Sequence, residues 1–462
     1  MKHSSIGYGI FAIFSANMIN LIFNLLTNFL LPKYLSVEAY AQIKTFLMYV
    51  GYVGVLHLGY SDGMYLRYGG VQITPKIREA LSTDIKTMRN FQLLVGILFL
   101  AVALFSRNPV LIASAIAIIP VNMTNYYKYL LQATGEFQSY SRILNFITIS
   151  TAVPILGLLL AGIREQYNYY LLVYLLVDVG ICFYLEWVAT RKYKLKSCSF
   201  SVSESIAIFT ENIRDGFFLM LGTFSSIILT GMDRWFIKVL MDNTAFAMYS
   251  FAVSMEGLMD VAVSPISTTL YNYFCVHTDR VELKKIKNQI IIFATLIVAC
   301  AFPAKFVLET FLTRYMEAGS VIFYLFASQI FYIIIKCFYV NLYKAQKKQK
   351  IYFAKLVTVI VLGFILNALL YAIMHTKEAF AIGTMLCGII WFILSELDFI
   401  FLRANIREIS YLTFASTAYI IIGLSFESVL GLFIYLAVVI VLLFTLMRKD
   451  TMEIIDRIHS MF

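Results

Sequence analysis

The stretch FFLMLGTFSSIILTGMDRWFIKVL, from Phe217 to Leu240, decides the class of fold. It begins as an apolar run that is broken only by small and weakly polar residues, and Asp233, Arg234 and Lys238 follow near its end. In a soluble protein such charges would mark an ordinary surface. In a bilayer each of them is costly and calls for a partner or a function. The rest of the sequence decides between these two interpretations.

The composition indicates a membrane protein. Of the 462 residues, 60% are hydrophobic and only 14% are charged, whereas soluble domains are about half apolar and a quarter charged. Apolar runs of about 18 residues or more recur along the chain, and each can cross about 30 Å of hydrocarbon. Because the runs are continuous and do not alternate, they exclude a transmembrane barrel. The sequence therefore predicts an all-α polytopic membrane protein.

The apolar runs predict about fourteen transmembrane helices, of which the third is marginal and the thirteenth short. A twelve-span arrangement, in which the last two runs form a re-entrant hairpin, is the alternative. The expected spans are approximately 7–31, 40–61, 91–106, 110–131, 143–163, 169–189, 216–237, 245–271, 289–308, 319–341, 352–374, 379–401, 411–425 and 428–447.

Lysine and arginine gather on one side of the predicted membrane, mainly in the segments 62–90, 190–215, 272–288 and 342–355. Since cytoplasmic loops are enriched in these residues, both termini are predicted to be cytoplasmic. Much of the net charge of +10 follows from this asymmetry, so no nucleic-acid partner is expected. The first apolar run is too long for a signal peptide and is expected to be retained. The six cysteines form no CxxC or His-Cys cluster, so neither disulfides nor zinc are expected.

Two pairs of segments indicate an internal repeat. LPKYLSVEAYAQ (Leu31–Gln42) resembles FIKVLMDNTAFAM (Phe236–Met248), and LLQATGEFQSY (Leu130–Tyr140) resembles LYKAQKKQKIY (Leu342–Tyr352). Chance similarity between apolar segments is the alternative. Both matches shift by the same even number of spans, which predicts two lobes of parallel topology.

The repeat predicts three parts of the chain. They are an N-terminal six-helix lobe with the start of a linker (1–200), a C-terminal six-helix lobe (201–402), and two extra transmembrane helices with a cytoplasmic tail (403–462).

Four stretches carry a resemblance to a known family: LPKYLSVEAYAQIKTF, LGYSDGMYLRYGG, LLQATGEFQSYSR and GMDRWFIKVLMDNTAFAMYSFA. They resemble the polysaccharide-export branch of the multidrug/oligosaccharidyl-lipid/polysaccharide exporter superfamily, and within it the O-antigen and capsule repeat-unit flippases. The resemblance implies alternating access and transfer of an undecaprenyl-pyrophosphate-linked oligosaccharide across the bacterial cytoplasmic (inner) membrane. It implies no cofactor. Beside the lipid-linked glycan and membrane lipids, a polysaccharide polymerase and a chain-length regulator are the candidate partners.

Cationic residues within or at the ends of spans are candidate ligands of the pyrophosphate. Arg234 and Lys238 lie one helical turn apart, and Lys336 interrupts the apolar stretch FYIIIKCFYV. Lys44 and Lys128 lie in other spans. The alternative for each residue is an interface anchor, whose long side chain reaches the headgroups. We expect Asp233 to hold Arg234 as a local ion pair.

Carboxylates within spans are candidate ion-coupling residues. Glu256 and Asp260 are spaced i, i+4, and Asp178 lies near the middle of another span, while Asp233 is a further candidate. Two interpretations remain open for Glu256 and Asp260. They pair with Arg234 or Lys336, or they bind a coupling proton or Na⁺.

The first span carries a stripe of amides, Asn17, Asn20, Asn24 and Asn28, on one helix face. A sugar-facing wall and polar packing between helices explain this stripe equally well.

Two other functions remain as alternatives to the flippase. A membrane-embedded polysaccharide polymerase, which is an enzyme, usually needs a sizeable outer loop, and the sequence has neither such a loop nor a catalytic motif in a usable context. A multidrug/cation antiporter of the same superfamily would favour a cavity dominated by carboxylates. Since the intramembrane charges here have both signs, the sequence favours a non-enzymatic transporter of an anionic lipid-linked glycan.

Overall fold

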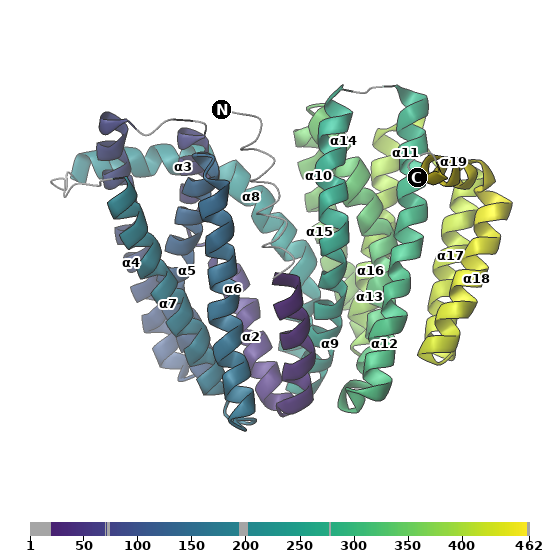
Figure 1. Cartoon of the computed structure of the whole chain (residues 1–462), viewed down its shortest axis with the longest axis horizontal. Helices are drawn as coiled ribbons and strands as arrows, with labels where there is room; N and C mark the ends of the chain where they lie inside the picture. The colour runs from purple at the N-terminus through teal and green to yellow at the C-terminus, as the bar shows by residue number, and fades with distance from the viewer. Residues whose placement is uncertain (1–19, 70, 72–73, 194–201, 277–278, 460–462) are drawn as a thin grey trace. The chain divides into compact units, whose positions relative to one another are not determined.

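The computed structural model describes residues 20–69, 71, 74–193, 202–276 and 279–459, and the regular secondary structure of these ranges is entirely helical. Eleven helices there are long and apolar enough to span a membrane, and a bent helix pair supplies a twelfth if it is counted as one span. The predicted all-α polytopic membrane fold is therefore confirmed (Figure 1). The chain divides into two compact units, unit 1 (Met1–Ile228) and unit 2 (Leu229–Phe462).

Unit 1 begins, within the described residues, with a helical segment from residue 20 to 34. Its further helices are α2 (Val37–Val53), α3 (Tyr60–Tyr68), α4 (Pro75–Ser106), α5 (Pro109–Ala133), α6 (Phe137–Leu160), α7 (Tyr167–Lys192) and the first part of α8 (Val202–Leu240). The unit boundary falls inside α8, so one continuous helix belongs to both units.

Unit 2 contains the end of α8 and, within the described residues, eleven further α-helices. They are α9 (Asn243–Glu256), α10 (Asp260–Val276), α11 (Arg280–Ile297), α12 (Ala301–Thr310), α13 (Ala318–Ile334), α14 (Val340–Ala345), α15 (Gln349–Met374), α16 (Glu378–Asp398), α17 (Ile406–Ser425), α18 (Ser428–Leu446) and α19 (Arg448–His459). The helices α17, α18 and α19 fall within the predicted C-terminal part, 403–462, and the predicted three-part division stays a prediction.

Three of the fourteen predicted spans have no counterpart among the eleven helices that qualify singly as membrane spans. The first, 7–31, begins outside the described residues. The second contains α2, which has only 17 residues. The eighth is the bent pair, whose two helices meet at an angle of 43° across the 3₁₀ turn Gly257–Met259. Pro265, inside α10, removes a backbone hydrogen bond and weakens this span further.

The positively charged segments predicted as loops are partly helical. Residues 62–90 contain most of α3 and the first half of α4, and residues 202–215 form the first turns of α8. Apolar runs report where the hydrocarbon lies, whereas a helix ends at its capping residues. Pro75 in the first turn of α4 is such a start signal, well before the apolar run.

The second pair of repeated segments has the same backbone hydrogen bonds in both halves. The amide of Glu136 donates to the carbonyl five residues earlier at 2.8 Å, and the amide of Lys348 does the same at 2.8 Å. The residues directly before them, Gly135 and Lys347, are left-handed, with φ of 73° and 57°. Each segment is thus a Schellman-type helix end followed by a new helix.

The first pair of repeated segments also agrees. Ser36 and Asp242 each cap the helix that follows, and each side chain accepts a hydrogen bond from the amide three residues later. Shared turns at both places favour a true repeat over chance similarity.

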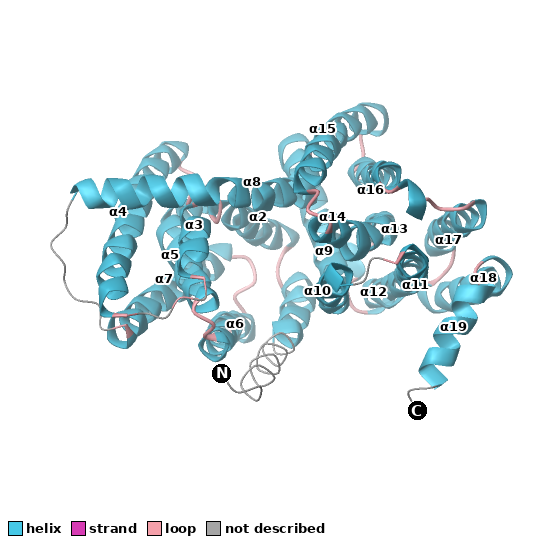
Figure 2. Cartoon of the chain, turned by 90° about the horizontal axis from the view of Figure 1, so that it is seen from above, coloured by secondary structure: helices cyan, strands magenta, loops and turns pink. Residues whose placement is uncertain are grey.

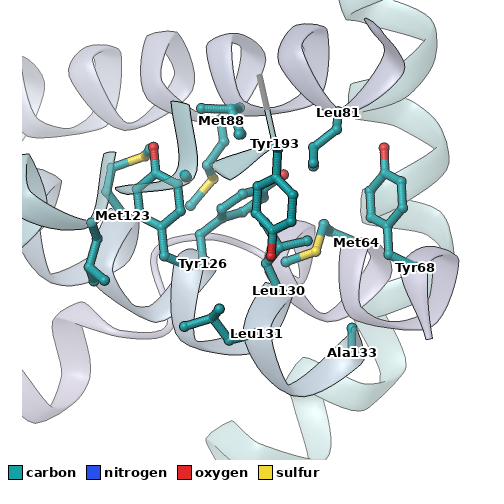
Figure 3. Packing of buried hydrophobic residues seen from close by; sticks show 14 of the residues in the cluster. Met64, Tyr68, Leu81, Met88, Met123, Tyr126, Leu130, Leu131, Ala133 and Tyr193 are labelled. Atoms are coloured by element: carbon teal, nitrogen blue, oxygen red, sulfur yellow. The ribbon is translucent and has the colours of Figure 1, made fainter. Parts of the chain in front are cut away.

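Each unit is built around one central helix. In unit 1, α5 contacts α2, α3, α4, α6 and α7, and its residues Met123, Tyr126 and Leu130 join Met64 of α3 and Met88 of α4 in a buried cluster (Figure 3). In unit 2, α13 is enclosed by α9, α11, α16 and α17 (Figure 2). The remaining helices present apolar side chains outward, as expected for helices in lipid.

Candidate functional site

Five intramembrane charges of unit 2 lie on helices that pack against one another, and we call them the charged cluster. They are Asp233 and Arg234 of α8, Glu256 of α9, Asp260 of α10 and Lys336 of the segment that links α13 to α14.

Asp233 is buried and held by two hydrogen bonds. The hydroxyl of Tyr249 on α9 donates to Asp233 Oδ2 at 2.6 Å, and the backbone N–H of Arg234 donates to Oδ1 at 2.7 Å. Met232 of α8 packs against Gly363 of α15, where an added Cβ would lie 2.6 Å from Met232 Cε and would make the methionine side chain shift.

The expected side-chain ion pair between Asp233 and Arg234 is not formed. Both carboxylate oxygens of Asp233 already accept a hydrogen bond, one from the Tyr249 hydroxyl and one from a backbone N–H. Arg234 is half-buried, and its Nε is buried without a hydrogen-bond partner. Within the described residues its guanidinium makes no ion pair, although its charge acts on Asp233 and on Glu256. Arg234 thus retains its capacity to bind an anion.

Glu256 and Asp260 stand on either side of the 3₁₀ turn that breaks the eighth span. Glu256 accepts a hydrogen bond from the side-chain amide of Gln329 on α13, and Asp260 forms an ion pair with Lys336. Of the two interpretations left open, pairing with Lys336 has the required geometry for Asp260. Glu256 has a neutral partner at its carboxylate, so ion binding stays open for it.

Lys336 lies in a π-helical turn, Ile335–Tyr339, that interrupts the 28-residue helical run Ala318–Ala345 through α13 and α14. The π turn displaces the carbonyl of Lys336, which accepts hydrogen bonds from Ser267 Oγ at 3.1 Å and from Asn341 Nδ2 at 3.4 Å. The contact with Ser267 joins this turn to α10, the helix that also carries Asp260.

Lys238 is less available than the sequence alone suggests. Its ammonium donates to Asn243 Oδ1 at 2.8 Å and lies 5.1 Å from the ring centre of Phe246. It therefore links the end of α8 to the start of α9, and both the ligand role and the interface-anchor alternative stay predictions.

Four candidates of unit 1 interact in two pairs, Lys44 with Asn28 and Lys128 with Asp178. Lys44 donates to Asn28 Oδ1 at 3.2 Å and lies 5.3 Å from the ring centre of Tyr40. Lys128 of α5 and Asp178 of α7 interact electrostatically, with no ion pair within 4 Å in the described part of the chain.

The amide stripe takes part in polar contacts within unit 1. Asn20 Oδ1 accepts a hydrogen bond from Thr148 of α6 at 3.0 Å and one from Asn24 at 3.4 Å. Asn17 lies outside the described residues. Since Asn28 also binds Lys44, packing between helices accounts for the contacts of this stripe, and a sugar-facing role stays a prediction.

Sequence reasoning missed a buried carboxylate in unit 1. Asp84 of α4 is fully buried and accepts hydrogen bonds from Tyr60 at 2.7 Å, from Tyr126 at 3.2 Å and from Asn212 at 3.3 Å. Arg67 lies 3.8 Å away. The signal was a polar residue in the apolar stripe of an amphipathic helix, but the segment was interpreted as a loop.

Sequence reasoning also missed a buried lysine, because it placed this residue in a loop. Lys287 of α11 is fully buried, with Glu396 at 2.8 Å, Glu408 at 3.4 Å and the carbonyl of Leu402 at 2.6 Å. Tyr339 donates to the same Glu396 at 2.8 Å. Three oxygen atoms therefore surround the Lys287 ammonium, which leaves it no free N–H donor for a ligand.

Comparison with known proteins gives one family match and several structures of similar fold. Residues 86–276 match the family model described as polysaccharide biosynthesis protein. None of the curated proteins matches the chain. The lipid II flippase MurJ, in an inward closed conformation, shares the fold with a TM-score of 0.62 at 16% identity, over 94% of this chain and 99% of that one.

Two further solved structures match less well. An outward-facing multidrug resistance MATE family transporter of the MOP superfamily has a TM-score of 0.48 at 12% identity, over 88% of this chain and 96% of its own. A MOP superfamily transporter from Pyrococcus furiosus has a TM-score of 0.44 at 11% identity, over 86% and 96% of the two chains.

Proposed function

We propose that this chain belongs to the polysaccharide-export branch of the multidrug/oligosaccharidyl-lipid/polysaccharide exporter superfamily, and that it is a lipid-linked oligosaccharide flippase and not an enzyme. The family match over residues 86–276 and the fold shared with a lipid II flippase support this proposal. Its substrate is an undecaprenyl-pyrophosphate-linked repeat unit for O-antigen or capsule biosynthesis. The chain moves this unit across the bacterial cytoplasmic membrane by alternating access and has both termini in the cytoplasm. A polysaccharide polymerase and a chain-length regulator are its partners in the same pathway.

The observation that carries this proposal is the unpaired guanidinium of Arg234. A cation costs about 2.5–3.5 kcal/mol more than an apolar residue near the middle of a membrane helix. The Tyr249 hydroxyl and a backbone N–H occupy the neighbouring carboxylate, which leaves the guanidinium available to an incoming anion. A guanidinium binds two phosphate oxygens at once, which suits a pyrophosphate.

The remaining members of the charged cluster have supporting roles in this proposal. Lys336 leaves Asp260 and adds a second cation when the headgroup arrives. Glu256, which lies beside the break in its span, carries the coupling ion. In unit 1, Lys44, Lys128 and the amides Asn20, Asn24 and Asn28 contact the substrate, as the sequence predicts.

The test compares cation variants in a strain that lacks its own flippase. Arg234→Ala should abolish surface polysaccharide at normal protein level, and Arg234→Lys should restore it only in part, because the two-oxygen geometry is lost. Lys336→Ala should impair export, and Lys336→Arg should retain it. Lys350→Ala, a change at an exposed lysine in the first turn of α15, is the control and should export normally.

Wild-type export by both alanine variants would contradict the cationic path and leave the charges as interface anchors. Reporter fusions at Lys194 and after Arg457 test the orientation separately, since an external signal from either would reverse the proposed topology.

A cation antiporter is the second candidate function. It is favoured by the three carboxylates of the charged cluster, Asp233, Glu256 and Asp260, which outnumber its cations. Efflux of a cationic dye that survives Arg234→Ala and is lost in Glu256→Gln would support the antiporter over the flippase.

A further inference from the structure

A cleft of about 730 Å³ lies in unit 2, at the start of α11 and α17 and at the junction of α18 with α19. We call it the basic cleft. Its walls carry six cations and three carboxylates, an excess of three positive charges: Arg280, Lys284, Lys285, Arg407, Arg448 and Lys449 against Glu408, Asp450 and Glu453.

The carboxylates of the basic cleft already have partners on its walls. Glu408 lies 3.6 Å from Lys284, and Glu453 lies 2.9 Å from Lys285. Asp450 accepts a hydrogen bond at 3.2 Å from the side-chain amide of an asparagine on α11. Glu408 and Glu453 therefore compensate Lys284 and Lys285, while Asp450 has a neutral partner. Against the four remaining cations its single charge leaves the excess of three.

The remaining cations face solvent without an acidic partner. Arg407, Arg448 and Lys449 are exposed, and within the described residues their side chains form neither a hydrogen bond nor an ion pair. Arg280 lies over the ring of Phe401, 5.0 Å from its centre, and forms no ion pair there either. Four positive groups around one cavity make a site that attracts an anion.

The level of the basic cleft in the membrane identifies the kind of anion. The candidate spans of α11, α17 and α18 all begin or end at its walls, at Arg280, Ile406 and Leu446. Span ends mark the level at which hydrocarbon gives way to lipid headgroups. From there α19 runs crosswise to α18 (Figure 1), with charged residues and the apolar Met452 on the cleft. A helix of this kind lies in the interface plane.

We propose that the basic cleft binds the phosphate-bearing headgroup of an anionic phospholipid from the adjoining leaflet. Its phosphate lies among Arg407, Arg448 and Lys449, and its acyl chains lie along the apolar residues at the end of α18. Bound lipid ties α17, α18 and α19 to the leaflet. The proposal does not depend on the transported substrate.

The test measures lipid binding to the purified full chain after delipidation in a neutral detergent. Native mass spectrometry with phosphatidylglycerol and with phosphatidylcholine gives the affinity of the first bound lipid. Each basic residue near an anionic surface adds about fivefold in affinity, so Arg407→Gln/Arg448→Gln/Lys449→Gln should weaken phosphatidylglycerol binding roughly a hundredfold. The double variant Arg448→Gln/Lys449→Gln should weaken it about 25-fold and provides a second test if the triple variant misfolds.

The control removes the same charge elsewhere. Lys344→Gln/Lys347→Gln/Lys350→Gln changes three exposed lysines outside the basic cleft and should bind phosphatidylglycerol like the wild type. Equal binding of the two lipids, or an unchanged affinity in the Arg448 and Lys449 variants, would overturn the proposal. Inorganic phosphate that displaces phosphatidylglycerol at comparable concentrations would assign the site to a free anion and overturn the lipid assignment.

Discussion

Replacement of Tyr249 by phenylalanine tests whether the structure keeps Arg234 available for a ligand. Tyr249 is fully buried and donates to Asp233 Oδ2 at 2.6 Å. A hydrogen bond to a charged group contributes about 1.5–3 kcal/mol, so its loss leaves the buried carboxylate short of a donor. The guanidinium of Arg234, whose charge already acts on Asp233, should then turn toward it.

If the new contact with Arg234 regains the energy of the lost hydrogen bond, the fraction of Arg234 side chains that remain free falls roughly 10- to 150-fold. This factor is about 1.5–3 kcal/mol expressed as an equilibrium ratio. We expect the initial rate of lipid-linked oligosaccharide transfer in proteoliposomes to fall by at least the lower factor. Tyr249→Phe/Asp233→Asn should recover much of the rate, because a neutral amide no longer attracts the guanidinium.

The control for this experiment is Tyr419→Phe. Tyr419 is also buried in unit 2, but its hydroxyl has no hydrogen-bond partner within the described residues, so transport should not change. If Tyr249→Phe transports at the wild-type rate with unaltered thermal stability, the reasoning about Asp233 and Arg234 is refuted.

Three further predictions concern other parts of the chain. Glu256→Gln should leave insertion intact and lower transport tenfold or more, because an amide cannot carry the coupling ion, and wild-type transport by this variant would remove Glu256 from the mechanism. Asp84→Ala should lower the free energy of unfolding by about 3 kcal/mol or more, because it leaves several buried donors unsatisfied, and thermal unfolding of the purified chain measures this. Lys347→Gly should raise the free energy of unfolding by roughly 0.5–1 kcal/mol, since glycine adopts the left-handed conformation without strain. Gly135→Lys should lower it for the same reason. Wild-type stability of both variants would contradict the strain argument.

The sequence predicted those features that follow from solvent and from local chemistry. Apolar runs place the spans because a bilayer requires about 20 apolar residues in a row. The repeated turns were predictable because a helix end depends on a few neighbouring residues, and Gly135 and Lys347 occupy the same left-handed position. The contact between Asp260 and Lys336 was one of two stated alternatives, since both charges lie within spans and have opposite signs.

The sequence did not predict features that depend on which helices become neighbours. Asp84 lies in a charged segment, and only the packing of α3, α5 and α8 around α4 shows that its surroundings are donors. Lys287 was counted as a loop charge for the same reason. The hydroxyl of Tyr249 reaches Asp233 only because α8 and α9 form a hairpin after Asp242, and no spacing rule specifies that contact.

Partners, more than burial, separate structural charges from functional ones in this chain. Asp84 and Lys287 are both fully buried, yet each is surrounded by groups that satisfy it, so a ligand would gain nothing by binding there. Arg234 is less buried but lacks an ion pair within the described residues. A cation that a membrane protein keeps unpaired lowers its stability, and the cost is tolerated where an anionic ligand offsets it during transport. On this argument Arg234 ranks ahead of Lys238, because the contacts of Lys238 with Asn243 and Phe246 already explain its position.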